Sequence, residues 1–66
     1  MFIVEDTEEG HFEGFQKNGQ RNGIGRLVFP DGGSYEGKWK DDVMDGYGQL
    51  FYSSGKLAYE GFWQNN

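Results

Sequence analysis

The sequence predicts an all-β protein: an antiparallel meander of β-hairpin repeats that forms one twisted layer of about six strands. Three observations predict it. Twelve of the 66 residues are glycine and twelve are aromatic, whereas proline occurs once. Disordered glycine-rich chains are poor in aromatic residues, and aromatics this dense require burial or stacking. Short segments alternate aromatic with charged residues, and this two-residue period is typical of a β-strand. The segments also recur along the chain.

The recurrence has a spacing of 23 or 24 residues. Phe12-Glu13-Gly14 returns as Tyr35-Glu36-Gly37 and then as Tyr59-Glu60-Gly61, and GIGRLVF at 23–29 returns as GYGQLFY at 46–52. Glycine inside a strand marks a close approach by another group, so we expect each repeated glycine to make room for a ring of a neighbouring strand. The glycines predicted to be structural in this way are Gly14, Gly23, Gly25, Gly37, Gly46, Gly48 and Gly61.

Each strand follows from the alternation and each turn from its residues. A short strand is expected over 2–5, followed by strands over 12–17, 24–30, 35–40, 47–52 and 57–63. Asp41-Asp42, Asp45-Gly46 and Ser53-Ser54-Gly55 supply turn chemistry. The chain therefore divides into a lead-in strand and acidic segment (1–10), a first repeat (11–34), a second repeat (35–58) and the first strand of a third (59–66).

This pattern resembles a known repeat. YEGKWK at 35–40, followed by DGYGQL at 45–50, is similar to the MORN repeat, which runs Y-E-G-x-W, a turn, and G-x-G-x-L-x-Y. The resemblance covers roughly residues 11–66, with Phe12 in place of Tyr and Gln16 in place of Trp. It implies a non-catalytic module for protein docking, membrane-proximal organisation or self-association, and a fragment of a longer array.

Alternation also sorts the side chains onto two faces of the sheet. One face carries the repeated glycines and the aromatic residues that form either the core or a groove for a partner peptide: Phe12, Phe29, Tyr35, Trp39, Tyr52, Tyr59 and Trp63. The opposite face mixes charges with an apolar cluster, which we predict to be a self-association face: Phe15, Ile24, Val28, Tyr47, Phe51 and Phe62. Clustered apolar side chains on a surface mark an interaction site.

Composition excludes several functions. Six Lys and Arg against eleven Asp and Glu give a net charge of −5, which argues against nucleic acid and disfavours anionic lipid. The chain has no cysteine and one histidine, so neither a disulfide nor a Cys/His zinc site is expected. No apolar run is long enough for a membrane helix, and the chain does not open with the basic segment of a signal peptide. Both observations favour a cytoplasmic location, which includes positions close to the cytoskeleton or to a membrane.

The remaining polar residues predict structural roles. The acidic run Glu5, Asp6, Glu8 and Glu9 is expected to be a solvated lead-in, and Asp41, Asp42 and Asp45 lack the alternating ligands of a calcium loop. His11 has no Cys, Ser or second His as a catalytic partner. We therefore expect no enzymatic activity, no metal site and no cofactor.

These observations favour a scaffold or protein-interaction module that binds a protein or peptide. Two alternatives stay open: an accessory targeting segment of an enzyme such as a lipid kinase or methyltransferase, as the resemblance implies, and a phospholipid-binding module. A chain this short has marginal stability, and the edges of its sheet are open. We therefore expect a homo-oligomer, with a two-fold dimer as its simplest form.

Overall fold

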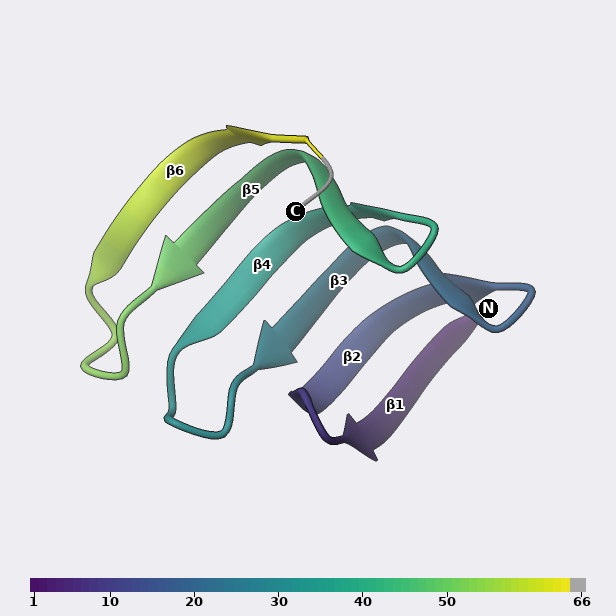
Figure 1. Ribbon diagram of the computed structural model, residues 1–66, viewed down its shortest axis with the longest axis horizontal. Coiled ribbons are helices and arrows are strands. Elements are labelled where there is room, and N and C mark those ends of the chain that lie inside the picture. Colours follow the sequence, from purple (N-terminus) through teal and green to yellow (C-terminus); the bar gives the residue numbers. More distant parts are fainter. Residues whose placement is uncertain (65–66) are drawn as a thin grey trace.

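The computed structural model describes residues 1–64, and these form a single antiparallel sheet of six strands in chain order (Figure 1). The strands are β1 (Phe2–Thr7), β2 (Gly10–Lys17), β3 (Gln20–Val28), β4 (Ser34–Lys40), β5 (Val43–Phe51) and β6 (Leu57–Trp63). The predicted all-β meander is confirmed. No helix that could cross a membrane occurs in this part of the chain.

From β2 onward, two kinds of connection alternate along the sheet. Tight two-residue turns join β2 to β3 and β4 to β5, and in both turns the central residues have positive φ: 53° and 80° at Asn18-Gly19, and 49° and 76° at Asp41-Asp42. This conformation matches the right-handed twist of the strands that it joins, and Asn, Asp and Gly adopt it most readily. Longer loops at 29–33 and 52–56 connect one hairpin to the next at the other end of the sheet.

The prediction that Asp45-Gly46 forms a turn was wrong, because both residues lie inside β5. Gly46 and its counterpart Gly23 have φ of 102° and 99°, and the strand register shifts beside each of them. They are β-bulge residues, which bend the strand and increase its twist. The strands β3 and β5 consequently begin about four residues earlier than the alternation predicted.

The bulges also correct the predicted face of these two glycines. A Cβ on Gly23 would lie 3.4 Å from Cβ of Phe15, and one on Gly46 would lie 3.1 Å from Cβ of Lys38. Both neighbours belong to the face opposite the aromatic core. Each irregularity places three residues, 22–24 of β3 or 45–47 of β5, opposite a single residue of the preceding strand. It therefore interrupts the in-and-out alternation on which the prediction depended.

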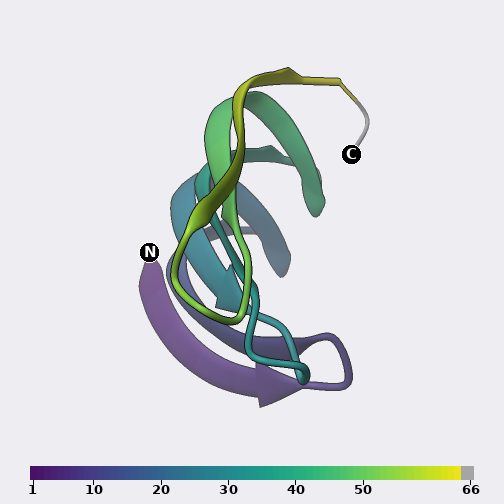
Figure 2. The ribbon, with the colours of Figure 1, turned by 90° about the vertical axis from the view of Figure 1, so that its left-hand side faces the viewer.

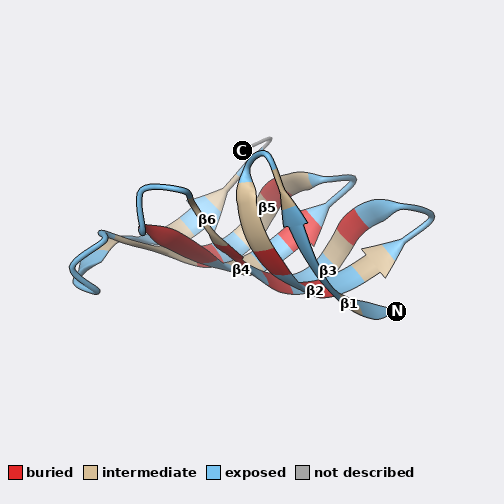
Figure 3. Cartoon of the chain, turned by 90° about the horizontal axis from the view of Figure 1, so that it is seen from below, coloured by how far each residue is buried: buried red, intermediate tan, exposed pale blue. Residues whose placement is uncertain are grey.

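The sheet is curled (Figures 2 and 3), and the core lies on its concave face. The buried apolar residues are Phe12, Leu27, Tyr35, Trp39 and Met44, and the residues that pack against them are Ile3, Phe29, Leu50 and Trp63. The rings meet edge to face, with centroids 5.5 Å apart for Phe12 and Trp39 and 5.3 Å apart for Tyr35 and Trp39. Edge-to-face contacts of this kind add stability beyond the area that they bury.

A row of five glycines crosses the sheet beneath these rings: Gly14, Gly25, Gly37, Gly48 and Gly61 stand opposite one another on β2 to β6. A Cβ on Gly25 would lie 2.5 Å from Cζ of Phe12, and one on Gly48 would lie 2.5 Å from Cζ of Tyr35. Each ring extends from one strand across the glycine of the next. The glycines are the reason that the rings lie flat enough for a single layer to bury a core.

Candidate binding surface

The concave face contains a hollow of about 350 Å³ above the core. Its lining residues are Glu9, Arg21, Leu27, Phe29, Trp39, Asp42, Val43 and Met44. Leu27, Trp39 and Met44 are buried and form an apolar floor, whereas Glu9 and Asp42 are exposed at the rim. An apolar concavity with a few convergent polar groups is the usual form of a binding site.

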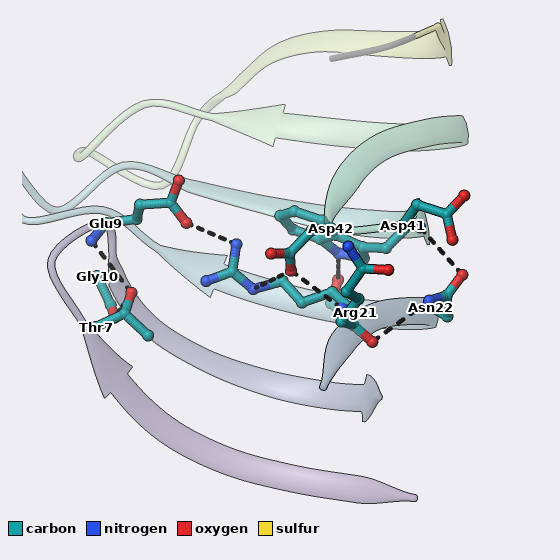
Figure 4. A network of polar contacts seen from close by, with 10 residues as sticks. Thr7, Glu9, Gly10, Arg21, Asn22, Asp41 and Asp42 are labelled. Carbon is teal, nitrogen blue, oxygen red and sulfur yellow. Dashed lines mark hydrogen bonds and ion pairs between the residues drawn. The ribbon is translucent and has the colours of Figure 1, made fainter. Parts of the chain in front are cut away.

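Arg21 is the central polar residue of the hollow. It is only 8% exposed, and its guanidinium lies over the rings of Phe12 and Trp39, with Cζ 4.9 Å and 5.1 Å from the ring centroids. Its Nη1 donates a hydrogen bond of 2.7 Å to Oε1 of Glu9, and its Nε lies 3.9 Å from Oδ1 of Asp42 (Figure 4). Cation–π contacts and two carboxylates together compensate the burial of this charge.

The sequence analysis did not single out Arg21. Its counterpart one repeat later, 23 residues along the chain, is Met44, which is also 8% exposed. Arginine and methionine share a long unbranched stem that can cover an aromatic ring. The sequence did contain a sign that Arg21 is buried, because Arg21 shares its repeat position and its long stem with Met44. The charge of arginine, however, favoured the prediction of a surface side chain.

Hydrogen bonds fix the rim of the hollow on the side of the β4–β5 turn (Figure 4). The backbone of Asp42 donates to the carbonyl of Arg21 at 3.0 Å, and Oδ1 of Asp42 accepts from the backbone N–H of Arg21 at 3.1 Å. The backbone N–H of Asp41 donates to Oδ1 of Asn22 at 3.1 Å. The turn is therefore tied to the start of β3, which holds the carboxylate of Asp42 beside the hollow.

The four residues of the acidic run, Glu5, Asp6, Glu8 and Glu9, are exposed as predicted, and the run is ordered as the end of β1 and the turn that follows it. Pairing of β1 with β2 continues to Thr7 and Gly10, so Glu8-Glu9 is a two-residue hairpin turn. Oγ1 of Thr7 accepts a hydrogen bond of 3.1 Å from the backbone N–H of Glu9, and this contact orders the turn. The turn brings Glu9 to Arg21, a contact between the predicted lead-in segment and the first predicted repeat.

The seven aromatic residues predicted to form the core or a groove are in different environments. Phe12 and Tyr35 are fully buried, and of the seven only Phe29 and Trp39 line the hollow. Trp63 lines a separate hollow at the end of β6. Tyr52 and Tyr59 are 61% and 47% exposed, because Tyr52 lies in a loop and Tyr59 lies on the edge strand.

The convex face carries a row of apolar side chains across the strands. Its exposed members are Phe2, Phe15, Ile24, Tyr47 and Phe62. Ring contacts join the row at both ends, with centroids 5.4 Å apart for Phe2 and Phe15 and 5.5 Å apart for Tyr47 and Phe62. Four of the six residues predicted for a self-association face belong to this convex row.

The other two predicted residues, Val28 and Phe51, are half-buried and stand on either side of Ser34. A polar row separates them from the convex row, and it consists of Glu13, Arg26, Glu36, Gln49 and Glu60. Within it, Nε of Arg26 donates to Oε2 of Glu36 at 3.2 Å. A hydrogen bond to Glu60 raises the pKa of Tyr47, whose hydroxyl is the donor.

His11 lies between two carboxylates on the convex face. Its Nδ1 is 2.7 Å from Oδ1 of Asp6 and its Nε2 is 3.0 Å from Oε2 of Glu13. These hydrogen bonds, that to Asp6 first, raise the pKa of the imidazole above its ordinary value. In the part of the chain that the structure describes, no group of three or more His, Cys, Asp or Glu side chains could hold a metal ion.

The fold and the surface define a single-layer protein of stacked β-hairpin repeats, with its core and its hollow on one face. The chain belongs to the MORN repeat family, which it matches over residues 9–34 and again over 35–56. It is a repeat module of a family that is typically non-catalytic. It is also similar to Protein TIC 100 of Arabidopsis thaliana, with 46% identity over 39 residues, which is 59% of this chain and 4% of that protein.

Proposed function

We propose that this chain is a non-catalytic protein-docking module whose concave hollow receives a side chain of a partner polypeptide. The observation that carries the proposal is the combination of an apolar floor with a fixed polar rim. Trp39, Leu27 and Met44 offer buried apolar surface, and Arg21 is held between two carboxylates above it. Large apolar anchors that fill such pockets supply most of the energy of protein association.

Affinity measurements on a matched pair of variants test this proposal. Random peptides displayed on phage are selected against the full chain, and the tightest are measured against Val43→Lys and Val4→Lys. Val43 lines the hollow, whereas Val4 stands opposite Glu13 on the convex face and is 59% exposed. The Val43 variant should bind about tenfold more weakly, equivalent to about 1.4 kcal/mol, and the Val4 variant should bind like the parent. Equal losses in both variants, or failure to select any peptide, would contradict a docking role for the hollow.

Self-association is a second candidate, and the convex row favours it. Phe62 is 79% exposed and Ile24 is 55% exposed, and both lie in one row with Phe2, Phe15 and Tyr47. Large contiguous apolar patches are uncommon on monomers. The net charge of −5 continues to disfavour a phospholipid surface as the partner. An accessory role within an enzyme is compatible with either surface, because docking is what such a role would require.

A further inference from the structure

The hollow on the concave face carries charge at positions where the other repeat carries none. Its charged lining residues are Glu9, Arg21 and Asp42. The residues 23 positions away, at the matching places of the repeat, are all uncharged: Gly32, Met44 and Gly19. Met44 is as buried as Arg21, at 8% exposure, so the fold does not require a charge at this position. Burial of a charge costs free energy, and these charges are therefore better explained by recognition than by folding.

Asp42 occupies a backbone conformation that favours glycine. Its φ is 76°, and that of Gly19, at the same place in the β2–β3 turn, is 80°. Such angles strain residues other than glycine, although Asp and Asn tolerate them best. The aspartate brings a carboxylate to the rim of the hollow, where its Oδ1 accepts from the backbone N–H of Arg21. Its side chain is 53% exposed, so it can also accept a hydrogen bond from another molecule.

Glu9 provides a second carboxylate with the same capacity. Its Oε1 accepts from Nη1 of Arg21 at 2.7 Å, and its side chain is 66% exposed. Figure 4 shows the two carboxylates on either side of the guanidinium. An ionised carboxylate accepts up to about four hydrogen bonds, so Arg21 saturates neither of them. Two carboxylates against one guanidinium leave the rim of the hollow negatively charged.

The other basic side chains lie away from the hollow. Alternation within the strands puts four of them on the convex face: Lys17, Arg26, Lys38 and Lys40. Lys56 lies in the loop at 52–56. Glu5, by contrast, stands opposite the buried Phe12 and so shares the concave face. In the strands that the structure describes, Arg21 is therefore the one basic side chain on a concave face that is otherwise acidic.

We propose that the partner segment that docks in the hollow carries a large apolar side chain flanked by Lys or Arg. This inference rests on the proposed function and names the chemistry of the partner at the same site. The apolar side chain packs on the floor of Leu27, Trp39 and Met44, and the cation pairs with Glu9 and Asp42. Complementary charge of this kind selects the partner more than it raises affinity. An acidic segment would be repelled by the two carboxylates, and the guanidinium between them is already paired.

The first test is the composition of selected peptides. Random peptides displayed on phage are selected against the full chain, and the sequences of the binders are compared with those of the unselected library. We expect Lys and Arg to be enriched about threefold at the positions next to a large apolar residue, a ratio that corresponds to the strength of one exposed ion pair. Enrichment of Asp or Glu at these positions, or no change, would overturn the inference.

The second test measures the tightest of these peptides against isosteric variants of the full chain. Glu9→Gln and Asp42→Asn keep the size of the side chain and an oxygen that accepts from Arg21. Each should weaken binding about threefold and the two together about tenfold, at an ionic strength of about 0.05 M. The matched control is Glu13→Gln, which changes the net charge by the same amount but stands opposite Arg26 on the convex face. It should bind like the parent, and a loss equal to that of the rim variants would contradict pairing in the hollow.

A change in the peptide separates pairing from damage to the fold. When the flanking Lys or Arg of the peptide is replaced by Gln, the parent and the double variant Glu9→Gln, Asp42→Asn should bind it equally, because the interaction that distinguished them is gone. A difference that persists with this peptide would overturn the inference. If the rim variants have no effect while Val43→Lys still weakens binding, docking in the hollow stands and the assigned charge of the partner is wrong. If no peptide is selected, or if Val43→Lys binds like the parent, the docking function and the inference both fail.

Discussion

Gly37→Val is the most direct perturbation of the glycine row. An ideal Cβ at this position would lie 2.5 Å from Cα of Gly48, 2.6 Å from the carbonyl oxygen of Tyr47 and 2.7 Å from the hydroxyl oxygen of Tyr35. The first two contacts are with the backbone of the neighbouring strand, so a rotamer change cannot relieve them. The strands must separate to relieve these two contacts, and the buried ring of Tyr35 must also shift to relieve the third.

The expected loss follows from these contacts. Overpacking a close-fitting core costs about 1 to 3 kcal/mol, and the backbone contacts place this variant at or above about 3 kcal/mol. For a domain of this size each kcal/mol shifts the melting temperature by about 4 to 8 °C, so a fall of at least about 12 °C is expected. Circular dichroism and tryptophan fluorescence during heating measure it.

Gly19→Asn is the matched control for this variant. Gly19 has φ of 80°, but an ideal Cβ there meets no atom within 4 Å, and asparagine tolerates positive φ. This change should cost less than about 1 kcal/mol. If Gly37→Val instead melts within two or three degrees of the parent, the account of rings packed over glycines is refuted.

Three further predictions concern single side chains. Arg21→Met should leave the free energy of unfolding within about 1 kcal/mol of the parent, as the equally buried Met44 indicates, whereas Arg21→Ala should lower it by about 2 kcal/mol in urea denaturation. Carboxylates raise the pKa of His11 in the folded state, so the stability that its pairing contributes is fully present below about pH 6.5 and is lost as the pH rises through the folded-state pKa. His11→Gln should remove this pH dependence of the free energy of unfolding. A variant with the same pH dependence as the parent would contradict the prediction. Phe62→Lys should weaken self-association in analytical ultracentrifugation. Its melting temperature should equal that of the parent, since Phe62 is 79% exposed. A parent chain that sediments as a stable monomer would contradict self-association.

The fold could be predicted from the sequence because the same pattern of aromatic, charged and glycine residues recurs along the chain. The alternation in 35–40 placed Tyr35 and Trp39 on one face, and both are in the core. The repeated glycines predicted rings across neighbouring strands, and in the structure Phe12 lies over Gly25 and Tyr35 lies over Gly48. Local patterns suffice here because every strand pairs with the strand next to it in the chain.

The features that the sequence did not reveal depend on backbone geometry within the repeats or on contacts with the lead-in segment. The bulges at Gly23 and Gly46 interrupt alternation, and dihedral angles rather than residue types identify them. The ion pair of Glu9 with Arg21 joins the β1–β2 turn to β3. Ile3 of β1 stands opposite Gly14, at the end of the glycine row, and β1 lies before the first predicted repeat. The hollow itself arises from the curl of the sheet, which no local pattern encodes.

The central functional claim is that partners dock in the concave hollow, and intermolecular nuclear Overhauser effects test it most directly. The labelled chain is mixed with the tightest peptide from the selection, and contacts between the two are recorded. The account predicts contacts from the Met44 methyl, the Leu27 methyls and the Trp39 ring to an apolar side chain of the peptide, since these residues form the floor of the hollow. Contacts from Phe15, Ile24 and Phe62 instead would place the binding site on the convex row and contradict the claim.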